Sequence, residues 1–184
     1  MKISDIQKIS NHISTKKHKY SQKEYLCKVE ELKSCCMNFL DMTNEKIHVY
    51  MKMFNELIEE ISLVIKNKFP NDSSVCFYNK MVKNHLKKYS SEPLLIFLKY
   101  IYTNDKYRQY IIEGNDVFFT KNKEIDNDKN IKEILMFKSY WNKLNDVDKD
   151  LIKNIMKTMV EICTNYVIDA DNGNIVTNIL LSYP

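Results

Sequence analysis

The chain has 184 residues, 44% of them hydrophobic, and its formal net charge is +4. That apolar content can fill the core of one domain, and with only two glycines and three prolines it excludes a disordered, collagen-like or linker-type chain. Arg108 is the only arginine and Ala170 the only alanine, whereas lysine, isoleucine and asparagine, which have AT-rich codons, are abundant. The composition therefore indicates an AT-rich genome, and the abundance of these residues is not by itself evidence for a particular function.

Positive charge is concentrated in two stretches of the chain. Residues 1–23 carry six lysines against Asp5, and residues 76–110 carry six lysines and Arg108 against two acidic residues, so each stretch has a net charge of +5. Since the whole chain is +4, the other positions sum to −6. Such a split produces a dipolar surface, which suggests an acidic partner or a nucleic-acid backbone at one end.

Residues 1–20 are expected to form a basic N-terminal segment that is partly flexible or helical. No apolar segment follows the first residues and no stretch of about 18 apolar residues occurs, so we expect neither a secretory signal nor insertion into a membrane. Residues 21–184 are expected to form a single all-α domain.

The stretch from residue 22 to residue 68 is predicted to be helical, because apolar residues recur at steps of three and four without proline or glycine. Ser21 and Glu24 have the spacing of a capping box, which predicts a helix start near residue 22. Asp41–Asn44 could cap a second helix, so this stretch forms either two helices or one kinked rod. We expect two helices with a soft junction, the second ending before Pro70.

A helix over residues 75–89 is predicted to place lysines on one face and apolar residues on the other, namely Tyr78, Met81, Val82, Leu86 and Tyr89. This basic interaction face is a candidate site, and its residues are Lys80, Lys83, Lys87 and Lys88. Residues 94–102 are apolar nearly all round, which predicts a central buried helix. A short helix from residue 104 to residue 112 should end at Gly114 as a C-cap, followed by a turn at 116–119.

The segment that ends this short helix is the second candidate site, a loop for binding a partner. Its residues are Glu113, Gly114, Asn115 and Asp116. A C-cap that leads Phe118 and Phe119 back into the core is the simpler explanation of the same residues. Both interpretations stay open at the level of sequence.

The last third of the chain is predicted to be a polar loop followed by further helices. The loop covers residues 120–130, and helices are expected over 130–144 and from 146 to about 168. A turn at 169–174 then precedes a short apolar tail at 175–181, which could be a helix or a strand. The predicted fold class is all-α, a single globular helical bundle of about seven or eight helices with a central buried helix near 94–102.

Three segments carry a resemblance to a known group of proteins: Pro93–Arg108, Glu113–Phe119 and Phe137–Leu144. In these segments the chain resembles small uncharacterised helical proteins of large nucleocytoplasmic DNA viruses, the giant viruses of protists. The resemblance extends over residues 55–167 and lies in helix packing, so it carries over no catalytic residue. It implies a viral protein located in the host cytoplasm or in the virion.

The motifs of common enzymes and metal sites are incomplete in this sequence. Glu45 and His48 form a single Glu-x-x-His, and a di-iron bundle needs two. Asp169–Asn174 resembles the start of a calcium loop, but its glycine is one position early and Leu180 stands where the bidentate Glu belongs. The five cysteines form no Cys-x-x-Cys and are expected to be free thiols. We therefore predict no catalytic residue, no metal and no cofactor.

These observations favour a non-enzymatic viral helical protein that acts through protein–protein contacts, as a virion or assembly component. Its partner would be another viral protein or a second copy of the chain. One alternative is a nucleic-acid-associated accessory protein that uses the lysine face, although the interleaved aromatic residues of a single-strand platform are missing and arginine is nearly absent. The other is a Bcl-2-like viral modulator of host cell death or immune signalling, for which chain length, helix number and a central buried helix are suitable.

Overall fold

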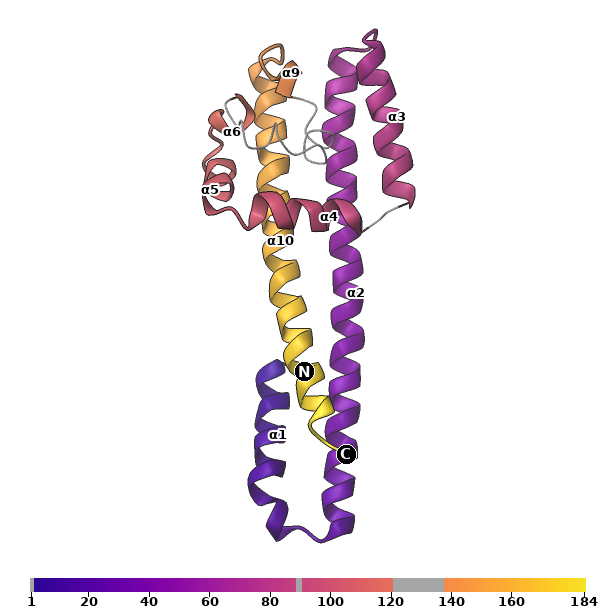
Figure 1. Ribbon diagram of the computed structural model, residues 1–184, viewed down its shortest axis with the longest axis vertical. Coiled ribbons are helices and arrows are strands. Elements are labelled where there is room, and N and C mark those ends of the chain that lie inside the picture. The colour runs from indigo at the N-terminus through magenta and orange to yellow at the C-terminus, as the bar shows by residue number, and fades with distance from the viewer. Residues whose placement is uncertain (1, 89–90, 121–137) are drawn as a thin grey trace. The chain divides into compact units, whose positions relative to one another are not determined.

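The computed structural model of the protein describes residues 2–88, 91–120 and 138–184 (Figure 1). Every regular element in these ranges is a helix, so the all-α prediction is confirmed. The polar loop predicted at 120–130 lies outside the described residues except for Thr120, and so does most of the helix predicted at 130–144. From that helix the structure shows α9 (Lys138–Trp141).

The described chain forms two compact units. One contains Met1–Val49 and Asn165–Pro184, and the other contains Tyr50–Thr164. The two long helices, α2 (Gln22–Lys68) and α10 (Asp146–Leu181), contribute to both units. This division differs from the predicted one into 1–20 and 21–184, because the N-terminal helix takes part in the core of the first unit.

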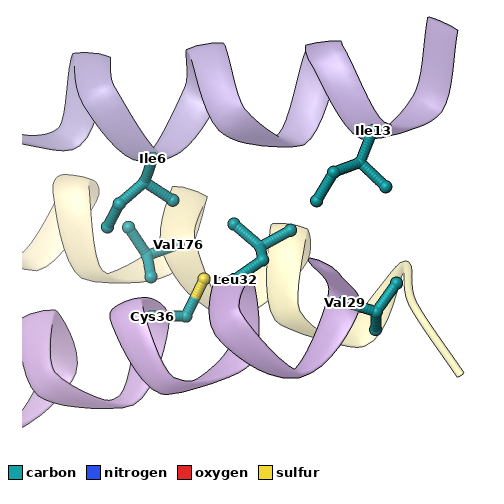
Figure 2. Close-up of a cluster of buried hydrophobic side chains, with 6 residues drawn as sticks. All are labelled: Ile6, Ile13, Val29, Leu32, Cys36 and Val176. Atoms are coloured by element: carbon teal, nitrogen blue, oxygen red, sulfur yellow. The ribbon is translucent and has the colours of Figure 1, made fainter. Parts of the chain in front are cut away.

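The first unit is built from α1 (Ile3–Lys16), the 3₁₀ turn η1 (Lys17–Lys19) and parts of α2 and α10. Figure 2 shows apolar side chains from all three helices converging on one core. Its buried members are Ile6, Ile13, Val29, Leu32, Cys36 and Val176. The C-terminal residues add to the packing, because the Tyr183 hydroxyl donates to the Ser10 carbonyl at 2.8 Å. The basic N-terminal segment is therefore mainly helical and packed.

The second unit contains the rest of α2, the start of α10 and a series of shorter helices. These are α3 (Ser73–Lys88), α4 (Glu92–Phe97), the π-helical turn η2 (Leu98–Tyr102), α5 (Asp105–Glu113), α6 (Val117–Thr120) and α9. In Figure 1, α3 runs back along α2, and α2 lies between α3 and α10. Aromatic rings fill the core: Phe54 meets Phe97 edge to face at 5.2 Å, and Phe119 stacks on Trp141 at 4.0 Å.

Several predicted helix ends are confirmed, and all of them are set by local contacts. Ser21 and Glu24 form the capping box, with the Glu24 amide donating to Ser21 Oγ at 3.3 Å and the Ser21 amide donating to Glu24 Oε2 at 2.9 Å. The Ser21 hydroxyl also donates to Glu24 Oε2, at 2.7 Å, and this bond, together with the one from the Ser21 amide, lowers the pKa of Glu24. Gly114 ends α5 in the left-handed region with φ 66°, and α2 ends at Lys68, before Pro70.

The prediction of two helices between residues 22 and 68 is wrong, because α2 is continuous over 47 residues. The hydroxyl of Thr43, which could have capped a new helix, donates instead to the carbonyl of Phe39 at 2.9 Å. This bond from residue i to residue i−4 is compatible with an uninterrupted helix. Since neither proline nor glycine occurs here, nothing in the backbone opposes continuation.

The turn predicted at 169–174 is also absent, and the tail at 175–181 belongs to α10. Gly173 lies inside this helix, where a Cβ would be 3.5 Å from Cγ2 of Thr43. Thr43 is 5% exposed, so α2 and α10 pack closely at this level of the first unit. Residues 169–174 favour a turn by their sequence, and the packing of α10 on α2 stabilises the helix there instead.

The segment 94–102 is helical as predicted, but it is not buried all round. Leu94, Phe97 and Ile101 are buried, whereas Leu95 is 45% exposed. The helix also changes from α to π geometry at Leu98. It therefore has one buried face and one face in contact with solvent.

Candidate interaction surface

Helix α3 packs on the other helices of the second unit through one face only. Val75, Tyr78, Asn79 and Val82 are buried, and they follow the three- and four-residue spacing of a helix stripe. Within this stripe the Asn79 side chain donates to Ser62 Oγ of α2 at 2.8 Å. The opposite face of α3 therefore points into solvent.

The start of α3 is fixed by Asp72, which caps the helix. Its Oδ1 accepts hydrogen bonds from the amides of Ser74 at 2.9 Å and Val75 at 3.2 Å, and its Oδ2 accepts one from the Tyr140 hydroxyl at 3.0 Å. The bond from the Val75 amide lowers the pKa of Asp72 most, and Tyr140 adds to the effect. Burial and the neighbouring carboxylate raise the pKa of Tyr140. The helix is thus anchored at its first turn.

The solvent-exposed face of α3 combines lysines with two large apolar side chains. Phe77 is 67% exposed and Met81 is 41% exposed, and they lie four positions apart, so they are neighbours on the helix. Around them lie the exposed residues Lys80, Asn84, Lys87 and Lys88. We call these six residues the α3 outer face.

Three of the four lysines predicted as a basic face belong to the α3 outer face. The fourth, Lys83, lies at its edge and forms an ion pair with Glu59 of α2, at 3.1 Å. Next to it, His85 lies 3.0 Å from Glu92. No acidic side chain of the described residues lies within ion-pair distance of Lys80 or Lys87. The exposed basic face therefore consists of Lys80, Lys87 and Lys88, while Lys83 is paired within the chain.

Sequence reasoning missed the exposed aromatic residue. Met81 was expected on the apolar stripe, and Phe77 was assigned to neither face of the helix. The spacing of Val75, Tyr78 and Val82 carries the missing signal, because Phe77 lies on the opposite side of the helix from that stripe. Tyr89, also assigned to the stripe, lies outside the described residues.

The predicted partner loop makes several contacts within its own unit. Asp116 forms an ion pair with Lys153 of α10 at 2.7 Å, and Glu113 accepts a hydrogen bond from Gln109 at 2.8 Å. Asn115 accepts one from the Val117 amide at 2.9 Å. Phe118 and Phe119 behind the loop are buried. The structure thus supports the C-cap that returns two aromatic residues to the core.

The only arginine of the chain also makes contacts within its own unit. Arg108 donates from Nη1 to the carbonyl of Tyr102 at 2.8 Å and forms an ion pair with Asp105. Its guanidinium lies 5.2 Å from the centre of the Tyr102 ring. Arg108 thus stabilises the end of the π-helical turn η2.

The described residues contain neither a metal site nor an ionised buried thiol. No three side chains of His, Cys, Asp or Glu in this part of the chain are placed to hold a metal ion. Burial raises the pKa of Cys163 to about 12 and also raises that of Cys36, so neither thiol is ionised at neutral pH. No helix within the described ranges combines the length and the apolar content needed to cross a bilayer.

Comparison with protein families, with curated proteins and with solved structures finds no match to this chain. A helix buried all round at 94–102, one of the three features that suit the Bcl-2-like alternative, is not present in the structure, since Leu95 is 45% exposed.

Proposed function

We propose that this chain is a non-enzymatic helical protein that acts through protein–protein contacts, and that the α3 outer face is its contact surface. Phe77 carries the proposal. An exposed phenylalanine gives up the free energy that burial would provide, about 2 kcal/mol. Clustered exposed apolar side chains with a polar rim are typical of interaction sites, and aromatic residues are enriched at the centres of interfaces.

We also propose that the protein is a virion or assembly component of a large DNA virus. The support comes from the sequence, through the resemblance over residues 55–167 and the AT-rich composition. A role in assembly requires contact surfaces rather than catalytic groups, which agrees with the proposed use of α3. Mass spectrometry of purified particles of the virus that encodes the chain should find it; its absence from both particles and assembly intermediates would contradict this part of the proposal.

Nucleic-acid binding is the second candidate, and the position of Phe77 among lysines favours it. A base could stack on the ring while Lys80 and Lys87 contact phosphates. One aromatic residue and a face without arginine form a small platform, so we rank protein contact first. If this alternative holds, affinity for single-stranded DNA should fall steeply with salt. Retention on heparin beyond about 0.5 M salt, lost when Lys80, Lys83, Lys87 and Lys88 are changed to Glu, would reverse our ranking.

Photo-crosslinking tests the contact surface directly. A benzoylphenylalanine in place of Phe77 should form an adduct with a protein in cells that produce the chain during infection. The matched control carries the same group at Ile112 of α5, which is 54% exposed in the same unit. Adding Lys80→Glu and Lys87→Glu should remove the adduct at position 77. Equal yields at both positions, or an adduct with nucleic acid only, would contradict the proposal.

A further inference from the structure

The second unit carries another surface of similar design and opposite charge. In the first turns of α10, Val147 is 77% exposed and Leu151 is 40% exposed, and they lie four positions apart. The exposed acidic residues beside them are Asp146 and Asp150. We call these four residues the α10 acidic face.

The carboxylates of this face are only weakly engaged within the chain. Asp150 has a side chain 72% exposed, and it lies 4.0 Å from Lys153. That lysine is already paired with Asp116 at the shorter distance of 2.7 Å. Asp148 points elsewhere, toward Lys68 at 3.6 Å. The negative charge of Asp146 and Asp150 is therefore available to a partner.

The α10 acidic face complements the α3 outer face in both charge and apolar content. Each has two apolar side chains one helical turn apart, Val147 and Leu151 on one and Phe77 and Met81 on the other. Two helices that bury such pairs against each other can place Lys80 and Lys87 beside Asp146 and Asp150. Opposite charges around an apolar centre fix the register of a contact and oppose wrong partners.

The two faces of one chain cannot meet. Both belong to the same compact unit, and in Figure 1 helix α2 lies between α3 and α10. The α3 outer face is directed away from α2, because the buried stripe of α3 packs on α2 through Asn79 and Ser62. A contact between the two faces therefore requires two molecules.

We propose that the α3 outer face of one molecule binds the α10 acidic face of a second copy of this chain. The inference rests on the proposed function, since it names the partner of the same surface. Such a contact joins two different surfaces, so one molecule of a pair keeps its α10 acidic face and the other keeps its α3 outer face for a further neighbour. Head-to-tail contacts of this type generate rings or filaments, which suits a protein that takes part in assembly.

Charge reversal tests the pairing. One variant carries Lys80→Glu and Lys87→Glu, a second carries Asp146→Lys and Asp150→Lys, and a third carries all four changes. Sedimentation velocity of the full chain at increasing concentration should show self-association of the natural protein. The first two variants should each weaken it at least about tenfold, because like charges then face each other. The third variant, and an equimolar mixture of the first two, should associate again.

The matched control for the first variant carries Lys8→Glu and Lys23→Glu. These two substitutions change the net charge by the same amount, at exposed residues of the first unit. The control should associate like the natural protein. Circular dichroism should confirm that all variants fold, since exposed substitutions cost about 0.5 kcal/mol or less each.

A natural protein that stays monomeric, association that survives both single-face variants, or a mixture that fails to associate would each overturn the inference. The proposed function fails separately, if position 77 forms no protein adduct. A monomeric chain whose position 77 crosslinks to a different protein would overturn self-association alone.

Discussion

Asn79 of α3 donates a hydrogen bond from Nδ2 to Oγ of Ser62 of α2 at 2.8 Å, and both side chains are buried. This polar contact lies inside an apolar interface, and it holds the helix whose opposite face carries Phe77. A buried polar group that loses its partner pays its desolvation cost without compensation, so the contact should be sensitive to substitution.

A double-mutant cycle measures this contact. We expect Asn79→Ala and Ser62→Ala each to destabilise the protein by about 1–3 kcal/mol. The double variant should cost less than the sum, with a coupling energy of about 1 kcal/mol, because the second substitution removes a group that is already unsatisfied. Chemical denaturation followed by circular dichroism provides the free energies. Strictly additive costs would show that the hydrogen bond contributes nothing specific.

The two glycines should respond in opposite directions to alanine. Gly114 has φ 66°, so Gly114→Ala should destabilise by about 1 kcal/mol, since an L-residue is strained in the left-handed region. Gly173 lies within α10, where a new Cβ would make an ordinary contact with Thr43 at 3.5 Å. Gly173→Ala should stabilise by up to about 1 kcal/mol through helix propensity. Denaturation midpoints measure both, and a destabilising Gly173→Ala would mean that α10 is not a continuous helix there.

Neighbouring leucines in α4 provide a test of the one-sided burial of this helix. Leu94 is fully buried and Leu95 is 45% exposed. Leu94→Asp should cost about 3–5 kcal/mol by burying an unpaired charge, whereas Leu95→Asp should cost less than about 1 kcal/mol. Thermal melts of the two variants distinguish them, and equal damage would indicate a helix buried all round.

The cysteines should react in an order set by burial. All five are free thiols in the structure; Cys27 is exposed, while Cys36 and Cys163 are buried. Because the reactive species is the thiolate, the raised pKa of Cys163, about 12, slows its alkylation further. Timed alkylation at pH 8 with peptide mass spectrometry should modify Cys27 first and Cys36 and Cys163 last. Without reductant, denatured protein should show five modified cysteines; a disulfide or rapid labelling of Cys163 would refute this.

Stability should decrease in acid partly through Asp72. Its pKa is lower in the folded chain than in the unfolded one, chiefly because the Val75 amide donates to the carboxylate. The stabilisation is therefore present above the ordinary pKa of an aspartate and is lost as the pH falls through the lower, folded-state value. Asp72→Asn should reduce the change in unfolding free energy between pH 7 and about pH 3. The same acid sensitivity in the variant would assign the effect to other carboxylates.

Local sequence determined where several helices begin and end. Ser21 and Glu24 start α2, Asn104 caps α5 by accepting from the Tyr107 amide at 3.2 Å, and Gly114 ends it. These caps act between residues no more than four apart. Each depends on one polar side chain or, at Gly114, on the lack of a side chain. The helical class and the solvent-exposed lysines of α3 follow from spacing in the same way.

Tertiary structure decided which helices continue and which side chains stay exposed. The sequence around Asp41–Asn44 and Asp169–Asn174 is compatible with turns, and the helices pass through both because Thr43 of one packs against Gly173 of the other. Leu95 and Phe77 are as apolar as the residues of the core, yet both stay exposed in the structure. A cap is a contact within one turn, whereas burial depends on partners far outside that turn, 17 residues away for Asn79 and Ser62 and more than a hundred for Thr43 and Gly173. Spacing alone does not identify such partners.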